Sequence, residues 1–270
     1  MSETEALSGR LDDIGQSFDN ETGLIRTRQP ATLPADPDRI AYFRQYLADY
    51  FNDAFVPGMG AEAILAALSD HGGTAAGRPC RWLDLGAGTS TLFWSLALDA
   101  VHEIWAADVI PEALIVLDGF ARASHVPPCY GDVMTMLGRP PDHLARMRRR
   151  MAGYLVFNAL TTWPSALAGE RFDLITAFGT IGIMPDAASH AACIAEIARH
   201  LAPGGRIVGT DWIRSPAFIA RDGHDNRYLD RPALESAAAT AGLTLRHGMK
   251  LPIQGDPLYD HILIWAFAAA

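Results

Sequence analysis

Short apolar runs alternate with amphipathic segments along most of the chain. Runs at residues 81–85, 103–107, 173–178 and 206–210 have the length and composition of buried strands. Between them, segments such as 90–98, 111–123 and 187–201 repeat apolar residues every three to four positions, which is typical of helices packed on a core. This alternation predicts right-handed crossovers, and therefore a doubly wound, Rossmann-like α/β fold with a mostly parallel sheet.

The two ends of the chain depart from this alternation. Residues 1–38 are polar and contain several prolines near their end, so we predict a loosely held, flexible arm. Residues 39–75 show helical periodicity and predict a helical cap. Near the other end, 243–251 and 261–267 are strand-like with no helix between them, which indicates an antiparallel hairpin on the sheet edge. Residues 76–270 thus form the main domain, with a sheet of seven strands.

A long connection, at about 133–172, does not fit the simple alternation. Its apolar run 154–160 can form a lid, a wall of a substrate pocket, or ordinary core packing. We interpret its arginine cluster as a solvated helix face, because runs of like charge usually face water. The cluster consists of Arg146, Arg148, Arg149 and Arg150.

Charge and cysteine usage narrow the possible functions. The formal net charge of −9 disfavours a protein that binds the phosphate backbone of DNA or RNA. The three cysteines show neither metal-ligand nor disulfide spacing, which indicates a reducing compartment and no metal site. With no signal-like N-terminus and no apolar run of about 18–20 residues, we expect a cytoplasmic protein without membrane contact. The alanine- and arginine-rich composition favours a bacterial source, and the oligomeric state is not predicted.

The segment 82–90, WLDLGAGTS, carries the most information. An apolar strand runs into a glycine-rich turn and then into a helix. Gly86 and Gly88 permit a tight turn and let a ligand approach the backbone closely. The N-terminus of the following helix favours polar or anionic ligand groups. Two glycines alone are weak support, because many strand-to-helix turns use them.

Acidic residues follow at the predicted ends of the next two strands. Asp108 ends the run 104–108, where a carboxylate can accept hydrogen bonds from both ribose hydroxyls of an adenosine. Asp132 falls where a third strand should end and can accept a hydrogen bond from an adenine amino group, with Val133 against the ring. Each aspartate can also be an ordinary cap or loop residue.

A dinucleotide-binding enzyme begins with the same kind of turn. Its fingerprint requires a third small residue, and this chain has Thr91 at that position. The C-terminal hairpin and the later Pro203-Gly204-Gly205 turn also fit a dinucleotide fold poorly. An NAD-dependent oxidoreductase is therefore disfavoured.

In chain order, the segments LDLGAGTS, AADVIPEAL, GDV, FDLITAF and LAPGGRIVGTDW resemble the motif series of class I S-adenosylmethionine-dependent methyltransferases, across roughly residues 80–267. The resemblance implies S-adenosyl-L-methionine as the cofactor. It implies that the glycine turn borders the methionine part of the cofactor, that Asp108 binds the ribose and that Asp132 binds the adenine. The main-domain residues implied to contact it are Asp84, Gly86, Ala87, Gly88, Thr89, Asp108, Val109, Asp132, Val133 and Phe178.

A finer resemblance concerns the first helix of the cap. Residues 46–51, YLADYF, are similar to the tyrosine-rich helix of the nicotinamide and phenylethanolamine N-methyltransferase group, which folds over the cofactor. By this resemblance Tyr46 and Tyr50 contact the cofactor, and Asp211, just after the fifth predicted strand, faces the substrate. Tyr46 and Asp211 would then position the reactants. The tyrosines can equally pack on the core, and the connection at 133–172 departs from that group.

The chemistry of methyl transfer separates the possible acceptors. Transfer from a sulfonium is an in-line displacement, so the protein mainly positions the reactants. A neutral amine or ring nitrogen has its lone pair available, whereas a hydroxyl or carbon nucleophile usually needs a base. Neither His224 nor His261 has a partner at a spacing that marks it as a base. We expect N-methylation of a small amine or nitrogen heterocycle, with small-molecule O-methylation or a non-catalytic cofactor-binding partner protein as alternatives.

Overall fold

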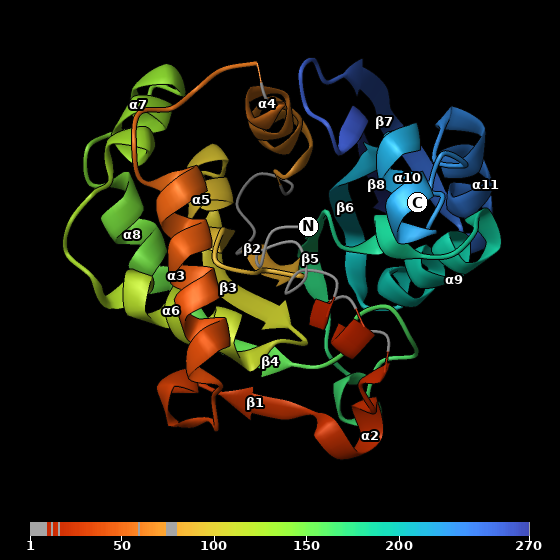
Figure 1. Ribbon diagram of the computed structural model, residues 1–270. Helices are drawn as coiled ribbons and strands as arrows, with labels where there is room; N and C mark the ends of the chain where they lie inside the picture. The colour runs from red at the N-terminus through yellow and green to blue at the C-terminus, as the bar shows by residue number, and fades with distance from the viewer. Residues whose placement is uncertain (1–9, 12, 16, 59, 74–79, 270) are drawn as a thin grey trace.

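One eight-stranded sheet organises the fold (Figure 1). The structure is a computed structural model that describes residues 10–11, 13–15, 17–58, 60–73 and 80–269. The strands follow the order β1-β4-β3-β2-β5-β6-β8-β7 across the sheet. Their bounds are β1 Ile25–Thr27, β2 Cys80–Leu85, β3 Val101–Asp108, β4 Met151–Val156, β5 Phe172–Phe178, β6 Leu201–Arg214, β7 Leu243–Pro252 and β8 Tyr259–Ala269.

The five central strands, β4-β3-β2-β5-β6, are parallel, and the strands that flank them, β1 and β8, run the other way. β8 pairs antiparallel with β6, and β7 pairs antiparallel with β8 at the edge. The predicted mostly parallel sheet and C-terminal hairpin are therefore confirmed. The eighth strand is β1, which pairs antiparallel with β4 through three residues.

Helices cover both faces of the sheet, because side chains of successive strand residues point to opposite faces. Trp82 packs with α4, α5, α7 and α8 on one face, and Leu83 packs with α9 and α11 on the other. Figure 1 shows these two groups of helices on opposite sides of the strands. The helix bounds are α2 Asn20–Gly23, α3 Pro37–Phe51, α4 Ala61–His71, α5 Thr91–Trp94, α6 Pro111–Arg122, α7 Pro128–Met136, α8 His143–Arg150, α9 Ala187–Ala198, α10 Pro216–Asp222 and α11 Arg231–Ala241.

Part of the predicted N-terminal arm is built into the domain. The buried Asn20 donates from Nδ2 to the backbone oxygens of Asn158 and Thr162, at 2.9 and 2.7 Å. Asn158 returns a 2.7 Å hydrogen bond from its backbone N–H to Asn20 Oδ1. These bonds hold α2 beside the end of β4, and β1 pairs with the edge of that strand, so the segment from Asn20 to Thr27 is part of the folded domain. Residues 1–9 of the arm lie outside the described residues.

The third strand is not where the sequence pattern predicted it. Residues 128–136, which include Asp132, form α7, and the third parallel strand is β4, at residues 151–156. Residues 154–156 of the apolar run at 154–160 are therefore the end of a buried strand, and the rest of the run follows it. The long connection precedes this strand and contributes α7 and α8. Helix formation after Pro128 is favoured because proline is tolerated in the first helical turn and fixes φ near the helical value.

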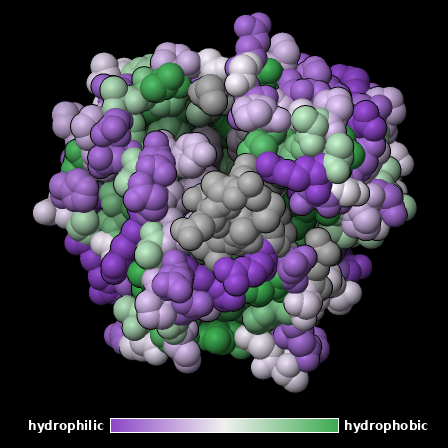
Figure 2. Space-filling model, viewed as in Figure 1, coloured by the Kyte–Doolittle hydropathy of each residue, from purple (hydrophilic) through white to green (hydrophobic). Residues whose placement is uncertain are grey.

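Two other predicted boundaries differ. The expected helix at 90–98 is the short α5 followed by a 3₁₀ turn, η2 (Ser95–Ala97). β6 continues to Arg214, so Asp211 lies within a strand instead of after it. In the described part of the chain, no helix is both long and apolar enough to cross a membrane. On the side seen in Figure 2, hydrophobic residues form small separate areas among hydrophilic ones.

Candidate active site

The glycine turn between β2 and α5 has the backbone geometry that its sequence predicts. Gly86 and Gly88 have φ values of +61° and +49°, in the left-handed region that favours glycine. A Cβ atom on Gly86 would collide with Thr180 Oγ1, so this glycine is needed for packing. A Cβ atom on Gly88 would meet nothing within 4 Å, so the backbone there is open to an approaching group.

Asp108, at the carboxyl end of β3, is bound to the same turn. Its Oδ2 accepts a 2.8 Å hydrogen bond from the Gly88 backbone N–H, and its Oδ1 accepts one of 2.9 Å from Ile110. Burial raises the pKa of this carboxyl, while the backbone donors oppose the rise. The side chain is half-buried, so the carboxylate is both positioned by the backbone and partly open.

Asp84, the residue before Leu85 in β2, makes its contacts inside the domain. Its two carboxylate oxygens accept 2.6 Å hydrogen bonds from the hydroxyls of Thr91 and Thr176. Burial raises its pKa to about 6, although both hydroxyls oppose the rise. Asp84 therefore ties β2 to α5 and β5, and its side chain is closed to solvent. Its predicted place beside the glycine turn holds for its backbone position only.

Two further residues of the turn are buried. The Ala87 backbone N–H donates to the Ala107 oxygen at 3.0 Å, which links the turn to β3. Thr89 is fully buried, and its Oγ1 has no hydrogen-bond partner within the described structure. A buried hydroxyl without a partner is costly, so it marks a position where a polar ligand group would be stabilising.

The end of β4 lies beside Asp108 and was missed by the sequence analysis. Val156 is the register partner of Asp108, and the Phe157 N–H donates to the backbone oxygen of Asp108 at 3.3 Å. Asn158 follows, almost fully buried, with an Nδ2 that has no partner in the described region. The signal that could have identified it is the continuous apolar run at 154–157, typical of a buried parallel strand and followed directly by asparagine.

Asp132 and Val133, predicted at a strand end beside an adenine, do not lie at a strand end. Asp132 is exposed on α7, and its Oδ2 accepts a 3.0 Å hydrogen bond from the Phe55 backbone. Val133 is fully buried in the core against α5 and α8. The prediction of a strand end at these residues is wrong, because they belong to a helix in the connection before the third strand.

Asp211, expected from the sequence to face the substrate, points into the interior of the domain instead. It is completely buried, its Oδ2 accepts a 2.9 Å hydrogen bond from Trp265 Nε1, and His190 Nε2 lies 3.6 Å from the same oxygen. Alternation along β6 turns Asp211 toward α9, while its neighbour Trp212 faces the α4 side. Trp212 is half-buried and lies over Gly179, so it is the β6 side chain on the face of the sheet that carries the candidate site.

Aromatic side chains connect the cap helix to the strand ends. The rings of Tyr46 and Tyr50 on α3 lie 4.7 Å apart, and Tyr46 lies 6.1 Å from Phe51. Phe51 lies 6.4 Å from Trp94, which contacts Phe178, at the end of β5, at 4.9 Å. The two tyrosines are 36% and 68% exposed, so they are not core residues.

Val109 is the last of the residues that the sequence predicted to contact the cofactor. It is half-buried and packs with Leu11 and Ile14 of the N-terminal segment, beside the buried Ile110 and Phe43. The structure thus brings the glycine turn, Asp108, Val109 and Phe178 to the carboxyl edge of the sheet. This is the edge at which open α/β sheets bind ligands.

A family described as a methyltransferase domain matches residues 39–247. The chain belongs to this methyltransferase family. The matched residues include α3, the glycine turn, Asp108 and the ends of β4, β5 and β6. The protein therefore has a methyltransferase domain, as the predicted motif series implied.

Several solved structures share the fold of this methyltransferase. The [4+2]-cyclase SpnF is 14% identical, with 88% of this chain and 98% of that chain covered and a TM-score of 0.56. An O-methyltransferase family 2 protein from Planctomyces limnophilus in complex with apigenin is 14% identical, covers 87% and 62%, and has a TM-score of 0.52. YcgJ from Bacillus subtilis is 15% identical, covers 77% and 98%, and also scores 0.52. No curated protein matches the chain.

Proposed function

We propose that this methyltransferase acts on the nitrogen of a small amine or nitrogen heterocycle. The observation that carries the proposal is the set of partly exposed aromatic side chains beside the carboxyl ends of β2, β3 and β5. The set comprises Tyr46, Tyr50, Phe178 and Trp212. Aromatic faces attract cationic groups within about 6 Å of the ring, and an N-methylation passes through a methylated, positively charged nitrogen.

The residues around the glycine turn fit an adenosine-containing cofactor. Gly88 leaves open space at the backbone, Asp108 offers a carboxylate to ribose hydroxyls, and Thr89 has an unpartnered buried hydroxyl. The free Nδ2 of Asn158 can donate to an adenine ring nitrogen, the role first assigned to Asp132. When bound, S-adenosylmethionine supplies an electrophilic methyl carbon attached to a good leaving group.

On the acceptor side, Asn226 holds the aromatic surface in place. Its Nδ2 donates to the Trp212 oxygen at 2.8 Å and to the Gly182 oxygen at 3.1 Å, and its Oδ1 accepts from the Arg214 backbone N–H at 2.9 Å. A fixed Trp212 and the tyrosine pair of α3 would orient an acceptor by stacking. The similarity of α3 to the tyrosine-rich helix of small-amine N-methyltransferases supports the same choice.

The buried acid–base groups favour nitrogen over oxygen as the acceptor atom. An oxygen nucleophile needs a base to remove its proton. A histidine next to an aspartate can act as such a base, but His190 and Asp211 are both fully buried inside the domain. A neutral amine reacts through its own lone pair. Positioning by the aromatic residues is then sufficient.

One observation favours O-methylation as a second candidate. His224 lies against Gly182, and burial, with the nearby Arg214 charge, lowers the pKa of its imidazole. A neutral imidazole near pH 7 can accept a proton from a hydroxyl. The two candidates therefore differ in whether His224 is needed.

A methyl-transfer assay with a panel of primary amines, nitrogen heterocycles and phenols separates the candidates. We expect turnover of nitrogen acceptors, with a rate that rises as pH passes the acceptor's own pKa, because only the neutral amine reacts. His224→Ala should keep kcat within about twofold, while Trp212→Ala should raise KM about tenfold. Turnover confined to phenols and abolished in His224→Ala would overturn the proposal in favour of O-methylation.

A further inference from the structure

The loop between β5 and α9, residues 179–186, contacts both the glycine turn and the aromatic surface proposed for the acceptor. It begins at the carboxyl end of β5 and contains the 3₁₀ turn η4 (Ile181–Ile183). Its first residue, Gly179, donates a 2.7 Å hydrogen bond from its N–H to the backbone oxygen of Thr210 in β6. A Cβ atom on Gly179 would lie 2.9 Å from the Trp212 ring, so this end of the loop packs closely on that ring.

Thr180, the next residue, contacts the glycine turn. Its hydroxyl donates a 3.0 Å hydrogen bond to the backbone oxygen of Leu85, the last residue of β2, and the Phe178 oxygen is a second, longer contact at 3.4 Å. A Cβ atom on Gly86 would lie 2.8 Å from both Cβ and Cγ2 of Thr180. The half-buried side chain of Thr180 therefore rests directly on the start of the turn, which has no room to move toward the loop.

The rest of the loop is held by residues that follow β6. The Gly182 oxygen accepts a 3.1 Å hydrogen bond from Asn226 Nδ2, and the Met184 oxygen accepts one of 2.7 Å from the Tyr228 hydroxyl. A Cβ atom on Gly182 would lie 2.7 Å from Asp211 Oδ1, so this buried carboxylate packs against the loop although it does not face the substrate. The loop is therefore fixed at several points and can hold the glycine turn and Trp212 at a constant separation.

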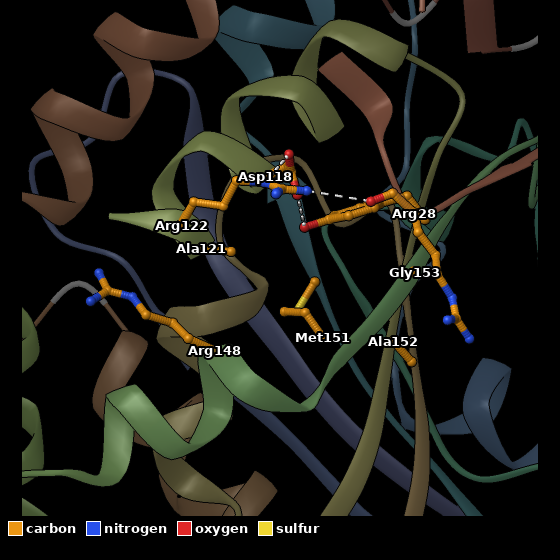
Figure 3. Close-up of a pocket in the computed structure, with 9 residues that line it drawn as sticks. Arg28, Asp118, Ala121, Arg122, Arg148, Met151, Ala152 and Gly153 are labelled. Carbon is orange, nitrogen blue, oxygen red and sulfur yellow. Dashed lines mark hydrogen bonds and ion pairs between the residues drawn. The ribbon is translucent and has the colours of Figure 1, made fainter. Parts of the chain in front are cut away.

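The cavity beside the start of β4 is separate from this connection (Figure 3). Its volume is about 350 Å³, and its lining residues come from the amino end of β4, from α6, from α8 and from the residue after β1. The Asp118 carboxylate there is bound by Arg122 and by the Tyr154 hydroxyl. Figure 3 shows Arg28 and Arg148 extending to opposite sides. The glycine turn follows the carboxyl end of β2, so the cavity contacts neither reactant.

We propose that Thr180 is a positioning residue, which sets the separation between a cofactor held at the glycine turn and an acceptor held beside Trp212. In methyl transfer the acceptor's lone pair forms a bond to the methyl carbon as the bond from that carbon to sulfur breaks. The three atoms must therefore be in line, with the acceptor about 3–3.5 Å from the carbon. This inference rests on the function proposed above, because it takes the cofactor to bind at that turn and the acceptor at that ring.

Steady-state kinetics of Thr180→Ala test the positioning role, with the amine, heterocycle or phenol that the wild type methylates fastest. We expect kcat to fall about tenfold or more, while the acceptor KM and the Kd of S-adenosylhomocysteine change by less than about threefold. The cofactor affinity should persist because the Gly88 N–H keeps its bond to Asp108. Thr180→Ser keeps the hydroxyl and should have a kcat within about threefold of the wild type. Turnover of phenols alone would overturn the proposed nitrogen acceptor, and the same comparison of kcat would still decide the role of Thr180.

Hydrogen exchange of the unliganded full chain gives a second readout that does not depend on turnover. The backbone amides of residues 85–89 should exchange about tenfold faster in Thr180→Ala and at nearly the wild-type rate in Thr180→Ser. Thr240→Ala is the matched control, because it removes an exposed threonine hydroxyl that donates to the Ser236 oxygen at 2.9 Å in α11; it should change neither kcat nor this exchange. Unchanged kcat or unchanged exchange in Thr180→Ala, or equal losses of kcat and cofactor affinity, would overturn the proposal.

Discussion

Two aspartates of this domain, Asp84 and Asp108, have different surroundings. Asp84 and Asp108 end neighbouring parallel strands, yet Asp84 is buried and bound by two threonine hydroxyls, while Asp108 is bound by backbone N–H groups at an open turn. Alternation along β2 turns Asp84 into the core on the α5 side. Asp84 thus stabilises the fold, and we propose that Asp108 binds the cofactor.

The raised pKa of Asp84, about 6, predicts a pH-dependent stability. The unfolded carboxyl loses its proton near pH 4, whereas the folded one keeps it until about pH 6. Between these values the unfolded state binds fewer protons, so the free energy of unfolding falls as pH rises, by about 3 kcal/mol from this group. Asp84→Asn keeps the shape without the charge and should lose this contribution.

Urea unfolding of the wild type and Asp84→Asn at pH 4.5 and pH 7.5 measures the effect. As pH rises from 4.5 to 7.5, the free energy of unfolding of the wild type should fall by more than that of Asp84→Asn. Parallel changes in both proteins would show that the Asp84 pKa is not raised.

At the scale of elements, the attachment of β1 to β4 depends on Asn20. Asn20→Ala removes the bonds to Asn158 and Thr162 and leaves buried backbone groups without partners, so it should lower the free energy of unfolding by about 3 kcal/mol. Asn52→Ala serves as the control, because Asn52 is exposed and, among the described residues, its side chain bonds only to Asp53 at 3.2 Å. Its effect should stay within about 0.5 kcal/mol. Chemical denaturation checks both, and equal losses would contradict this view of β1.

The elements also show what sequence patterns can and cannot predict. β2, β5 and the C-terminal hairpin follow directly from apolar runs, because their burial is decided by local composition. α7 and β4 could not be separated in this way, because a Gly-Asp pair at the expected spacing occurs inside a helix. The pairing of Asn20 with Asn158 joins residues far apart in the chain, so no local signal predicts it.

The same distinction applies to the candidate site. The positions of the glycine turn and Asp108 were predictable, because a turn with positive φ needs glycine and the end of the next parallel strand lies beside that turn. The direction of Asp211 was not, because it depends on where β6 ends. A strand longer than expected carried that residue into the core and left Trp212 on the opposite side.

For the whole molecule, the parallel sheet separates two edges with different chemistry. The carboxyl edge gathers the glycine turn, Asp108, Asn158 and the aromatic residues, while the amino end of β4 follows the arginine-rich end of α8. Cofactor binding at the carboxyl edge is the claim on which the proposed chemistry depends.

The measurement that tests this claim most directly is calorimetric titration with S-adenosylhomocysteine of the wild type, Asp108→Asn and the exposed control Asp70→Asn. We expect 1:1 binding by the wild type and by Asp70→Asn with equal affinity. Binding by Asp108→Asn should be about 10- to 100-fold weaker, because charge-assisted hydrogen bonds are lost. Absence of binding by the wild type, or unchanged affinity in Asp108→Asn, would contradict it.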